Sequence, residues 1–352
     1  MNQKIADLLL DNKYKVYIAT RLYDYSQKIQ AEKLEKIVIQ ALTEVTNIRK
    51  FDAPITFVPF RDINEDKLIS SDKALSIFQE DIKRLSTDAL CLVGVYNDIS
   101  KDDGIAFEIG YLYAYSIPIF LLNTDFIWFR LIKEREEFVY DPIITTMAKS
   151  IMRCYEIPTT SDDFKVRLCD GFNNALFLVL EKLKGYFSSY TESQCYRTLV
   201  NLKKTPGKVF IDFGGGRCEY QREYAKKFVS SINKYASKVS VGSRYEPSDI
   251  PFNSRAINDM RNFEEAEIYV FSAEEPEVDS GSAALVGYAY ATGKEIFMYY
   301  SGNIEILGDG NQKMKKNLMV ECACTDTLFT FEALKERVIK SLSDRGINVN
   351  SN

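Results

Sequence analysis

The chain has 352 residues, 46% of them hydrophobic, and this length predicts two folded units rather than one. A net charge of only −5 gives no electrostatic reason to expect a nucleic acid or a membrane surface as a partner. The sequence contains no histidine. This excludes Ser-His-Asp triads, Cys-His pairs and HExxH zinc sites, so acid–base chemistry would fall to carboxylates, Tyr, Lys, Cys or water.

The cysteines and the apolar segments indicate a cytoplasmic protein. Seven cysteines are scattered along the chain, an odd number typical of reduced thiols in the cytosol. No apolar run approaches the roughly 20 residues of a membrane span. The first residues are too polar for a signal peptide. We expect a soluble, cytoplasmic protein without a metal or another cofactor.

Strand-like and helix-like segments alternate through the first half of the chain. Short apolar runs predict strands at 15–20, 55–60, 89–96 and 118–122. Helical spacing of apolar residues predicts helices at 26–45, 72–85, 104–115 and 164–186. This alternation is typical of a parallel sheet with helices on both faces.

The same order returns in the second half. Strands are predicted at 208–212, around Val239, at 268–271 and at 295–300, with helices at 219–235, 254–265, 282–292 and 329–343. Lys203, Lys204, Pro206 and Gly207 interrupt the pattern between the halves. We therefore expect an α/β protein of two tandem doubly wound, flavodoxin- or Rossmann-like domains, at residues 1–191 and 205–352.

Two segments show that the halves are an internal repeat. The segment 102–114 (DDGIAFEIGYLYA) matches 279–291 (DSGSAALVGYAYA), an offset of 279 − 102 = 177. The segment that begins at Asp81 matches one that begins at Asp259, an offset of 259 − 81 = 178. In this alignment, Leu285 occupies the position of Glu108.

The Gly-x-Ala-x-Glu-x-Gly-Tyr pattern from Gly104 to Tyr111 resembles the nucleoside 2-deoxyribosyltransferase family. The resemblance covers most of the first half and, more weakly, the second. It implies that Glu108 attacks the anomeric carbon of a nucleoside and forms a covalent sugar ester. The chemistry of a carboxylate suits this role, as in retaining glycosidases. Amides near the start of the helix should keep Glu108 ionised, and Gly104 and Gly110 should allow a sugar to approach closely.

The resemblance also implies roles for three residues around Glu108. Asp102 would protonate and hold the leaving base, although it could equally be a helix N-cap. Asp81 would contact the base, or be a solvated helical carboxylate; its spacing to Asp88 is one residue shorter than in the family. Tyr17 would orient Glu108, or simply be a core aromatic residue.

The turn after the first strand departs from the family. Thr20 and Arg21 stand where many relatives have small, glycine-rich residues. We expect both to contact the substrate, and Arg21 could meet a phosphate. The alternative for Arg21 is an ordinary exposed arginine.

The second half carries an Asn-Leu-Met segment that begins at Asn317. In the family, this asparagine enters a neighbouring subunit's site and binds the sugar 5′-hydroxyl. The first half has Thr145-Thr146-Met147 at roughly this place. The resemblance therefore implies an intrachain pseudo-dimer with one working site; alternatively, Asn317 serves only local structure.

Two further segments could bind ligand. The triglycine turn between Phe213 and Arg217 could hold a phosphate at the following helix. Phe126, Trp128 and Phe129 could stack on a nucleobase.

These features predict cleavage of the N-glycosidic bond of a (deoxy)nucleoside or nucleotide, with transfer to another base or to water. The alternative is a non-catalytic nucleotide-sensing or interaction module, as in bacterial signalling or defence. The expected partners are a small nucleoside or nucleotide and further copies of the chain.

Overall fold

The structure is a computed structural model of the whole chain. It describes residues 2–11, 14–21, 25–51, 54–62, 73–97, 102–125, 129–130, 137–154, 164–191, 198–274, 277–302, 305–308 and 312–347.

The first half contains a parallel sheet of five strands. In spatial order they are β2 (Thr56–Phe57), β1 (Lys15–Ala19), β3 (Ala89–Val95), β4 (Ile119–Asn123) and β7 (Ser150–Arg153). The central strand β3 is apolar and buried along its whole length, because helices cover both faces of the sheet. The order 2-1-3-4-5 is that of flavodoxin-like doubly wound folds.

Two groups of helices cover this sheet. The outer face packs against α1 (Gln3–Leu10), α2 (Tyr25–Thr46) and α7 (Phe164–Ser188). The inner face packs against α4 (Lys73–Thr87), α5 (Asp103–Ala114) and α6 (Pro142–Met147). The short helix α3 (Pro59–Asp62) follows β2, and β5 (Phe129–Arg130) pairs with β6 (Glu137–Phe138).

The second half repeats this arrangement. Its sheet, in the same spatial order, consists of β9 (Lys238–Val241), β8 (Lys208–Asp212), β10 (Ile268–Ser272), β11 (Glu295–Tyr299) and β14 (Asp326–Leu328). The outer helices are α8 (Glu219–Ile232) and α12 (Phe331–Asp344), and the inner helices are α9 (Phe252–Glu265), α10 (Ser280–Ala291) and α11 (Leu318–Ala323). A triglycine 3₁₀ turn, Gly214–Gly216, precedes α8, and β12 (Ile306–Gly308) pairs with β13 (Gln312–Met314).

The predicted fold, two tandem doubly wound parallel sheets, is confirmed. The predicted helices differ from the observed ones by a few residues at their ends, where sequence patterns are least informative. The sequence did not predict the short helix and edge strand of each half, α6 with β7 and α11 with β14. These elements are too short to show a clear hydrophobic period.

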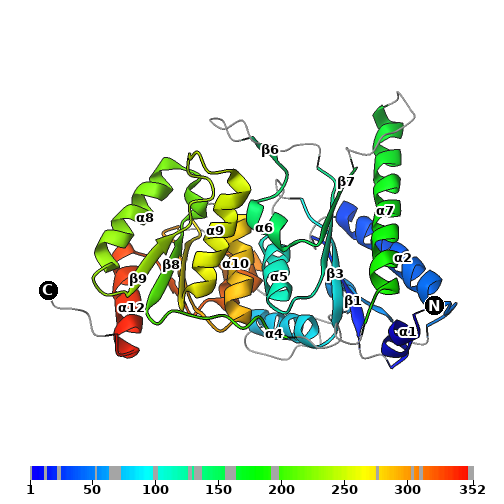
Figure 1. Cartoon of the computed structure of the whole chain (residues 1–352), viewed down its shortest axis with the longest axis horizontal. Coiled ribbons are helices and arrows are strands. Elements are labelled where there is room, and N and C mark those ends of the chain that lie inside the picture. The colour runs from blue at the N-terminus through cyan, green and yellow to red at the C-terminus, as the bar shows by residue number, and fades with distance from the viewer. Residues whose placement is uncertain are drawn as a thin grey trace.

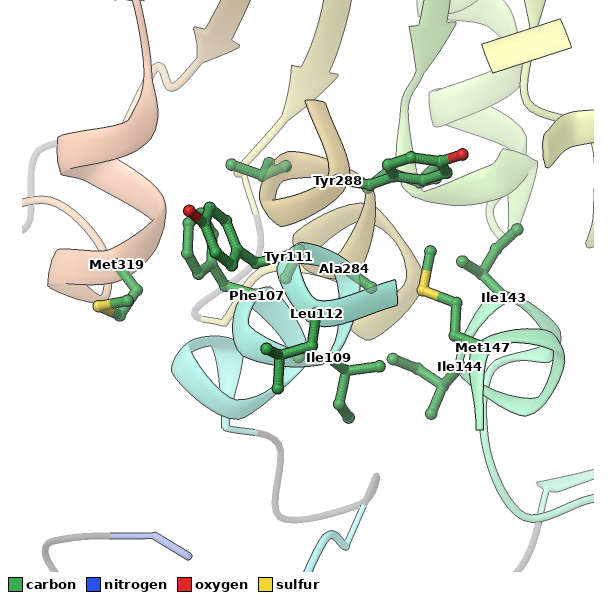
Figure 2. Packing of buried hydrophobic residues seen from close by; sticks show 14 of the residues in the cluster. Phe107, Ile109, Tyr111, Leu112, Ile143, Ile144, Met147, Ala284, Tyr288 and Met319 are labelled. Carbon is green, nitrogen blue, oxygen red and sulfur yellow. The ribbon is translucent and has the colours of Figure 1, made fainter. Parts of the chain in front are cut away.

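The inner helices of the two halves face each other in the middle of the molecule, with α7 at one side and α8 and α12 at the other (Figure 1). One hydrophobic cluster runs through both halves, so the halves share a core. Figure 2 shows helix α5, which carries Phe107 and Tyr111, packed beside helix α10, which carries Ala284 and Tyr288. The chain is therefore an intrachain pseudo-dimer.

Two equivalent glycines make this contact possible. A Cβ atom on Gly110 would overlap the backbone of Ala284, and one on Gly287 would overlap the carbonyl of Phe107. Gly110 was expected to admit a sugar; instead it admits the neighbouring helix, so this expectation was wrong.

Within the described part of the chain, no helix combines the length and apolar character that crossing a membrane requires.

Candidate functional site

Glu108 and Tyr17 form a buried hydrogen-bonded pair in the first half. The Tyr17 hydroxyl donates to Glu108 Oε1 at 2.7 Å. Tyr17 points inward from β1 and is 1% exposed, while Glu108 lies one turn into α5 and is 7% exposed. The phenol thus fixes the carboxylate of Glu108 against the sheet, the contact expected from the sequence.

The surroundings of Glu108 favour its protonated form. Burial raises the pKa of the Glu108 carboxyl well above its usual range, and the charges of Asp81 and Asp102 raise it further. The hydrogen bond from Tyr17 acts in the opposite direction. Burial and two neighbouring carboxylates thus oppose the ionisation of Glu108 that the helix amides were expected to favour.

Asp102 caps helix α5. Its Oδ1 accepts hydrogen bonds from the amides of Gly104 at 2.9 Å and Ile105 at 3.1 Å, so the N-cap alternative is confirmed. The side chain is partly exposed and its charge reaches Glu108. Burial raises the pKa of Asp102 even though both amides and Arg21 act to lower it. A carboxyl with these properties can both cap a helix and carry a proton.

Asp81 reaches the same site from α4. It is 7% exposed, so it is not the solvated carboxylate that was the alternative. Its charge raises the pKa of both Tyr17 and Glu108. The structure therefore gathers the three other residues predicted as catalytic, Tyr17, Asp81 and Asp102, around Glu108.

The turn after β1 borders this site. Thr20 is buried, and its Oγ1 makes no hydrogen bond to the described residues. Arg21 is one third exposed and lies 3.5 Å from Glu277 of the second half. Both charged side chains act on the pKa of Asp102, Arg21 lowering it and Glu277 raising it. Glu277 was not predicted from the sequence, because it comes from a loop outside the repeated motif.

Asn317 lies beside the first-half helix α5, as expected for a pseudo-dimer. A Cβ on Gly104 would lie 3.0 Å from Asp102 Oδ1 and 3.1 Å from Asn317 Nδ2. Gly104 therefore leaves room for both side chains at the start of α5. Asn317 also caps its own helix, because its Oδ1 accepts from Met319 N at 2.9 Å.

The first-half counterpart of Asn317 is Asp141. Each is the N-cap of a six-residue helix, Asp141 of α6 and Asn317 of α11. Each also lies against the first glycine of the other half's central helix, Asp141 beside Gly281 and Asn317 beside Gly104. The expected counterpart, the segment 145–147, was wrong, because it lies at the end of α6 rather than at its cap.

The second half has lost the Tyr–Glu pair. In the two sheets Tyr17 pairs with Leu92 and Phe210 with Tyr269, so Phe210 occupies the position of Tyr17. Leu285, which replaces Glu108, is fully buried. Both members of the hydrogen-bonded pair are thus apolar in this copy.

A buried arginine occupies the corresponding region of the second half instead. Arg244 has no exposed surface, and its Nε lies 2.8 Å from Asp141 and its Nη1 3.0 Å from Asp212. Its Nη2 pairs with Asp279, and Asp259 lies 4.0 Å away. The sequence did not predict this cluster, because Arg244 lies in a loop without similarity between the halves.

The triglycine turn closes around this arginine. Gly214, Gly215 and Gly216 all have positive φ, at 61°, 62° and 74°. A Cβ on Gly215 would lie 2.7 Å from Arg244 Cγ, and Tyr245 N donates to Gly215 O at 2.9 Å. The glycines thus enclose the side chain of Arg244, at the turn where a bound phosphate was one possibility.

Phe126 and Trp128, expected to stack on a base, lie outside the described residues, as does the side chain of Phe129.

Sequence comparison finds a family that is similar to part of the first half. Residues 16–143 match the family described as Nucleoside 2-deoxyribosyltransferase. This segment is nucleoside 2-deoxyribosyltransferase-like. The matched segment contains Tyr17, Asp81, Asp102 and Glu108 but not Asn317. No curated protein matches the chain.

Two solved structures are similar to part of the chain. One is a 2-deoxyribosyltransferase from Bacillus psychrosaccharolyticus, with 15% identity and a TM-score of 0.31 over 38% of this chain and 95% of that one. The other is a conserved protein from Enterococcus faecalis V583, with 16% identity and a TM-score of 0.32 over 40% of this chain and 99% of that one.

Proposed function

We propose that the first half cleaves the N-glycosidic bond of a (deoxy)nucleoside or nucleotide through a sugar ester on Glu108. The observation that carries this proposal is the buried Tyr17–Glu108 hydrogen bond beside Asp81 and Asp102. The loss of both partners in the second half supports it, since Phe210 and Leu285 leave that copy without a nucleophile.

In the first step, a Glu108 carboxylate oxygen bonds to the anomeric carbon as the C–N bond breaks. The electron pair of that bond leaves with the base, and a proton from Asp102 or Asp81 neutralises the departing nitrogen. In the second step, a nitrogen of another base, or a water molecule, attacks the same carbon. The ester bond breaks, Glu108 is released as a carboxylate, and the incoming nucleophile gives its proton back to the aspartate.

The proposal divides the chain into a catalytic domain at 1–191 and a degenerate domain at 205–352. The division is supported by the end of α7 at Ser188 and the start of β8 at Lys208. In this division, the second domain contributes Asn317 and Glu277 to the site of the first.

The test is release of free base from deoxynucleosides, deoxynucleotides and NAD, with and without an acceptor base. Glu108→Gln should abolish release, and a 2-fluoro sugar should leave a mass adduct on Glu108. A matched control is Glu264→Gln. Glu264 lies away from the site and accepts a hydrogen bond from the Tyr288 hydroxyl at 2.9 Å. Ligand binding without base release in the wild type would refute the proposal and favour a nucleotide-sensing module.

A further inference from the structure

The buried arginine of the second half is surrounded by carboxylates. Its guanidinium meets oxygens of Asp141, Asp212 and Asp279 within hydrogen-bond distance, and Asp279 also accepts from Arg217 at 2.5 Å. A guanidinium is a planar group of N–H donors without an acceptor. The carboxylates in this region of the second half therefore surround a group that only donates hydrogen bonds.

The residues that hold the guanidinium occupy the same places as the predicted site residues of the first half. Asp279 caps α10 as Asp102 caps α5, and the repeat aligns the two. Asp259 aligns with Asp81 at an offset of 178 residues, one more than the offset between Asp102 and Asp279. The third carboxylate, Asp141, is the counterpart of Asn317, as shown above.

The first half places its own arginine elsewhere. Phe57 pairs with Tyr17 and Ser240 with Phe210, and an arginine follows four residues after each, Arg61 and Arg244. Arg61 is exposed and bonds Glu35 of α2 at 2.7 Å, on the outer side of the sheet. Helix α3 directs Arg61 to this outer side, whereas the corresponding segment of the second half is an irregular loop.

We propose that the guanidinium of Arg244 occupies in the second half the position that part of the substrate occupies in the first half, where Asp102 and Asp81 bind it. The inferred ligand is a base that presents an amino group to these carboxylates, such as cytosine or adenine, rather than a base with a carbonyl at that position. This inference rests on the proposed function, because it names the substrate class of the same site.

The charges of the two regions refine the inference. The first half has Ala19 where the second has Asp212, and the amide Asn317 where the second has the carboxylate Asp141. Because the first half has fewer carboxylates, its site suits the neutral amidine edge of an aminated base rather than a charged guanidinium.

An amino edge at this place also explains how Glu108 becomes reactive. Burial raises the pKa of Glu108, and the charges of Asp81 and Asp102 add to the effect. One of the two aspartates keeps the proton for the leaving nitrogen, and the other would accept a hydrogen bond from the amino group of the base. The repulsion between that ionised aspartate and an ionised Glu108 would then weaken, and binding would favour the nucleophilic form.

The experiment compares two matched pairs of substrates: deoxycytidine with deoxyuridine, and deoxyadenosine with deoxyinosine. Each pair differs by an amino group in place of a carbonyl oxygen. We expect kcat/KM to favour the amino member about tenfold or more, since tenfold corresponds to about 1.4 kcal/mol. Asp81→Asn, which replaces an acceptor oxygen with a donor, should reduce or reverse this ratio.

Glu274→Gln is the matched control, because Glu274 lies on the same loop as Glu277 but bonds Ser301. It should leave the ratio unchanged. Equal or reversed preference in the wild type, with base release intact, would overturn the inference while the proposed function stands. If neither these four nucleosides nor the corresponding deoxynucleotides release base, the proposed function fails. Calorimetry with free cytosine and uracil then tests the inference alone, and equal affinities would overturn it.

Discussion

The backbone of Gly110 packs directly against the backbone of Ala284 where α5 crosses α10. The equivalent Gly287 makes the matching contact with Phe107, so the two halves approach through a pair of side-chain-free positions. The proposed site depends on this approach, because it brings Asn317 to the first turn of α5.

Gly110→Ala should destabilise the protein by about 3 kcal/mol or more, because the new methyl group has no space at a backbone contact. Urea unfolding followed by circular dichroism measures this loss. Gly185→Ala is the control: Gly185 is exposed in α7 with nothing within 4 Å of its Cβ position. It should add up to about 1 kcal/mol of stability, as expected for alanine in a helix. Equal effects of the two substitutions would contradict the close packing.

Tyr17→Phe should move the pH dependence of activity. Glu108 must be ionised to attack, so kcat/KM rises with pH through the pKa of Glu108. The hydrogen bond from Tyr17 lowers this pKa, and its removal should shift the rising limb to more alkaline pH. Activity should therefore fall more at pH 6 than at pH 9. Tyr288→Phe removes a second Tyr–Glu hydrogen bond, to Glu264, and should leave the profile in place. An unshifted profile in Tyr17→Phe would argue against Glu108 as the titrating group.

Arg244→Met should cost about 3–5 kcal/mol of stability, because it leaves several buried carboxylates without their cation. Arg337→Met is the control, since its pair with Asp326 is partly exposed and should contribute less than about 1 kcal/mol. Denaturant unfolding of both variants gives the comparison. A loss in Arg244→Met no larger than in the control would show that the cluster is not a structural core.

Asn317 can be tested separately as a helix cap and as a site residue. Asn317→Ala should weaken substrate binding and also remove the cap of α11, at a cost of about 1 kcal/mol. Asn317→Asp keeps a capping oxygen, as Asp141 does in α6, but loses the amide donors. It should reduce kcat/KM with little change in stability. Unchanged steady-state kinetics in both variants would remove Asn317 from the site.

Asp103 should make stability depend on pH. Burial raises its pKa to about 7, although its Oδ2 accepts a hydrogen bond from Val278 N at 3.0 Å. In the unfolded chain an aspartate titrates near 3.9. The folded state therefore holds the proton more tightly, and this stabilisation is lost as pH rises through about 7.

Asp103→Asn removes this dependence. Its melting temperature relative to wild type should be higher at pH 8.5 than at pH 5.5, by a few degrees. The exposed Asp7→Asn variant should show the same difference at both pH values. A pH-independent difference for Asp103→Asn would contradict the burial effect.

The sequence predicted those parts of the fold and the site that its internal repeat makes visible. The motif around Glu108 recurs around Leu285, and the alternating strands and helices indicate the sheets. The cap residues Asp141 and Asn317 share a position but not their neighbours, so alignment placed the counterpart of Asn317 at 145–147 instead. The effects that raise the pKa of Glu108 could not be predicted either, because the sequence around the helix start does not show burial or carboxylates from other elements.

The cluster around Arg244 could not be predicted for a related reason. Its members come from five separate segments, including Asp141 of the other half. Glycines in the turn before α8 indicated a phosphate, since short glycine runs before helices often hold one. Only the folded structure shows that Arg244 already lies against Gly215. The homo-oligomer expected from the sequence stays a prediction.

The covalent link between the halves also changes what a substitution can do. In a dimer of identical subunits, any replacement at the cap position appears at both sites, so the two sites must evolve together. Here the positions of Asp141 and Asn317 are encoded separately. The two positions can therefore change independently: Asp141 belongs to the ion cluster around Arg244, whereas Asn317 presents an amide beside Gly104.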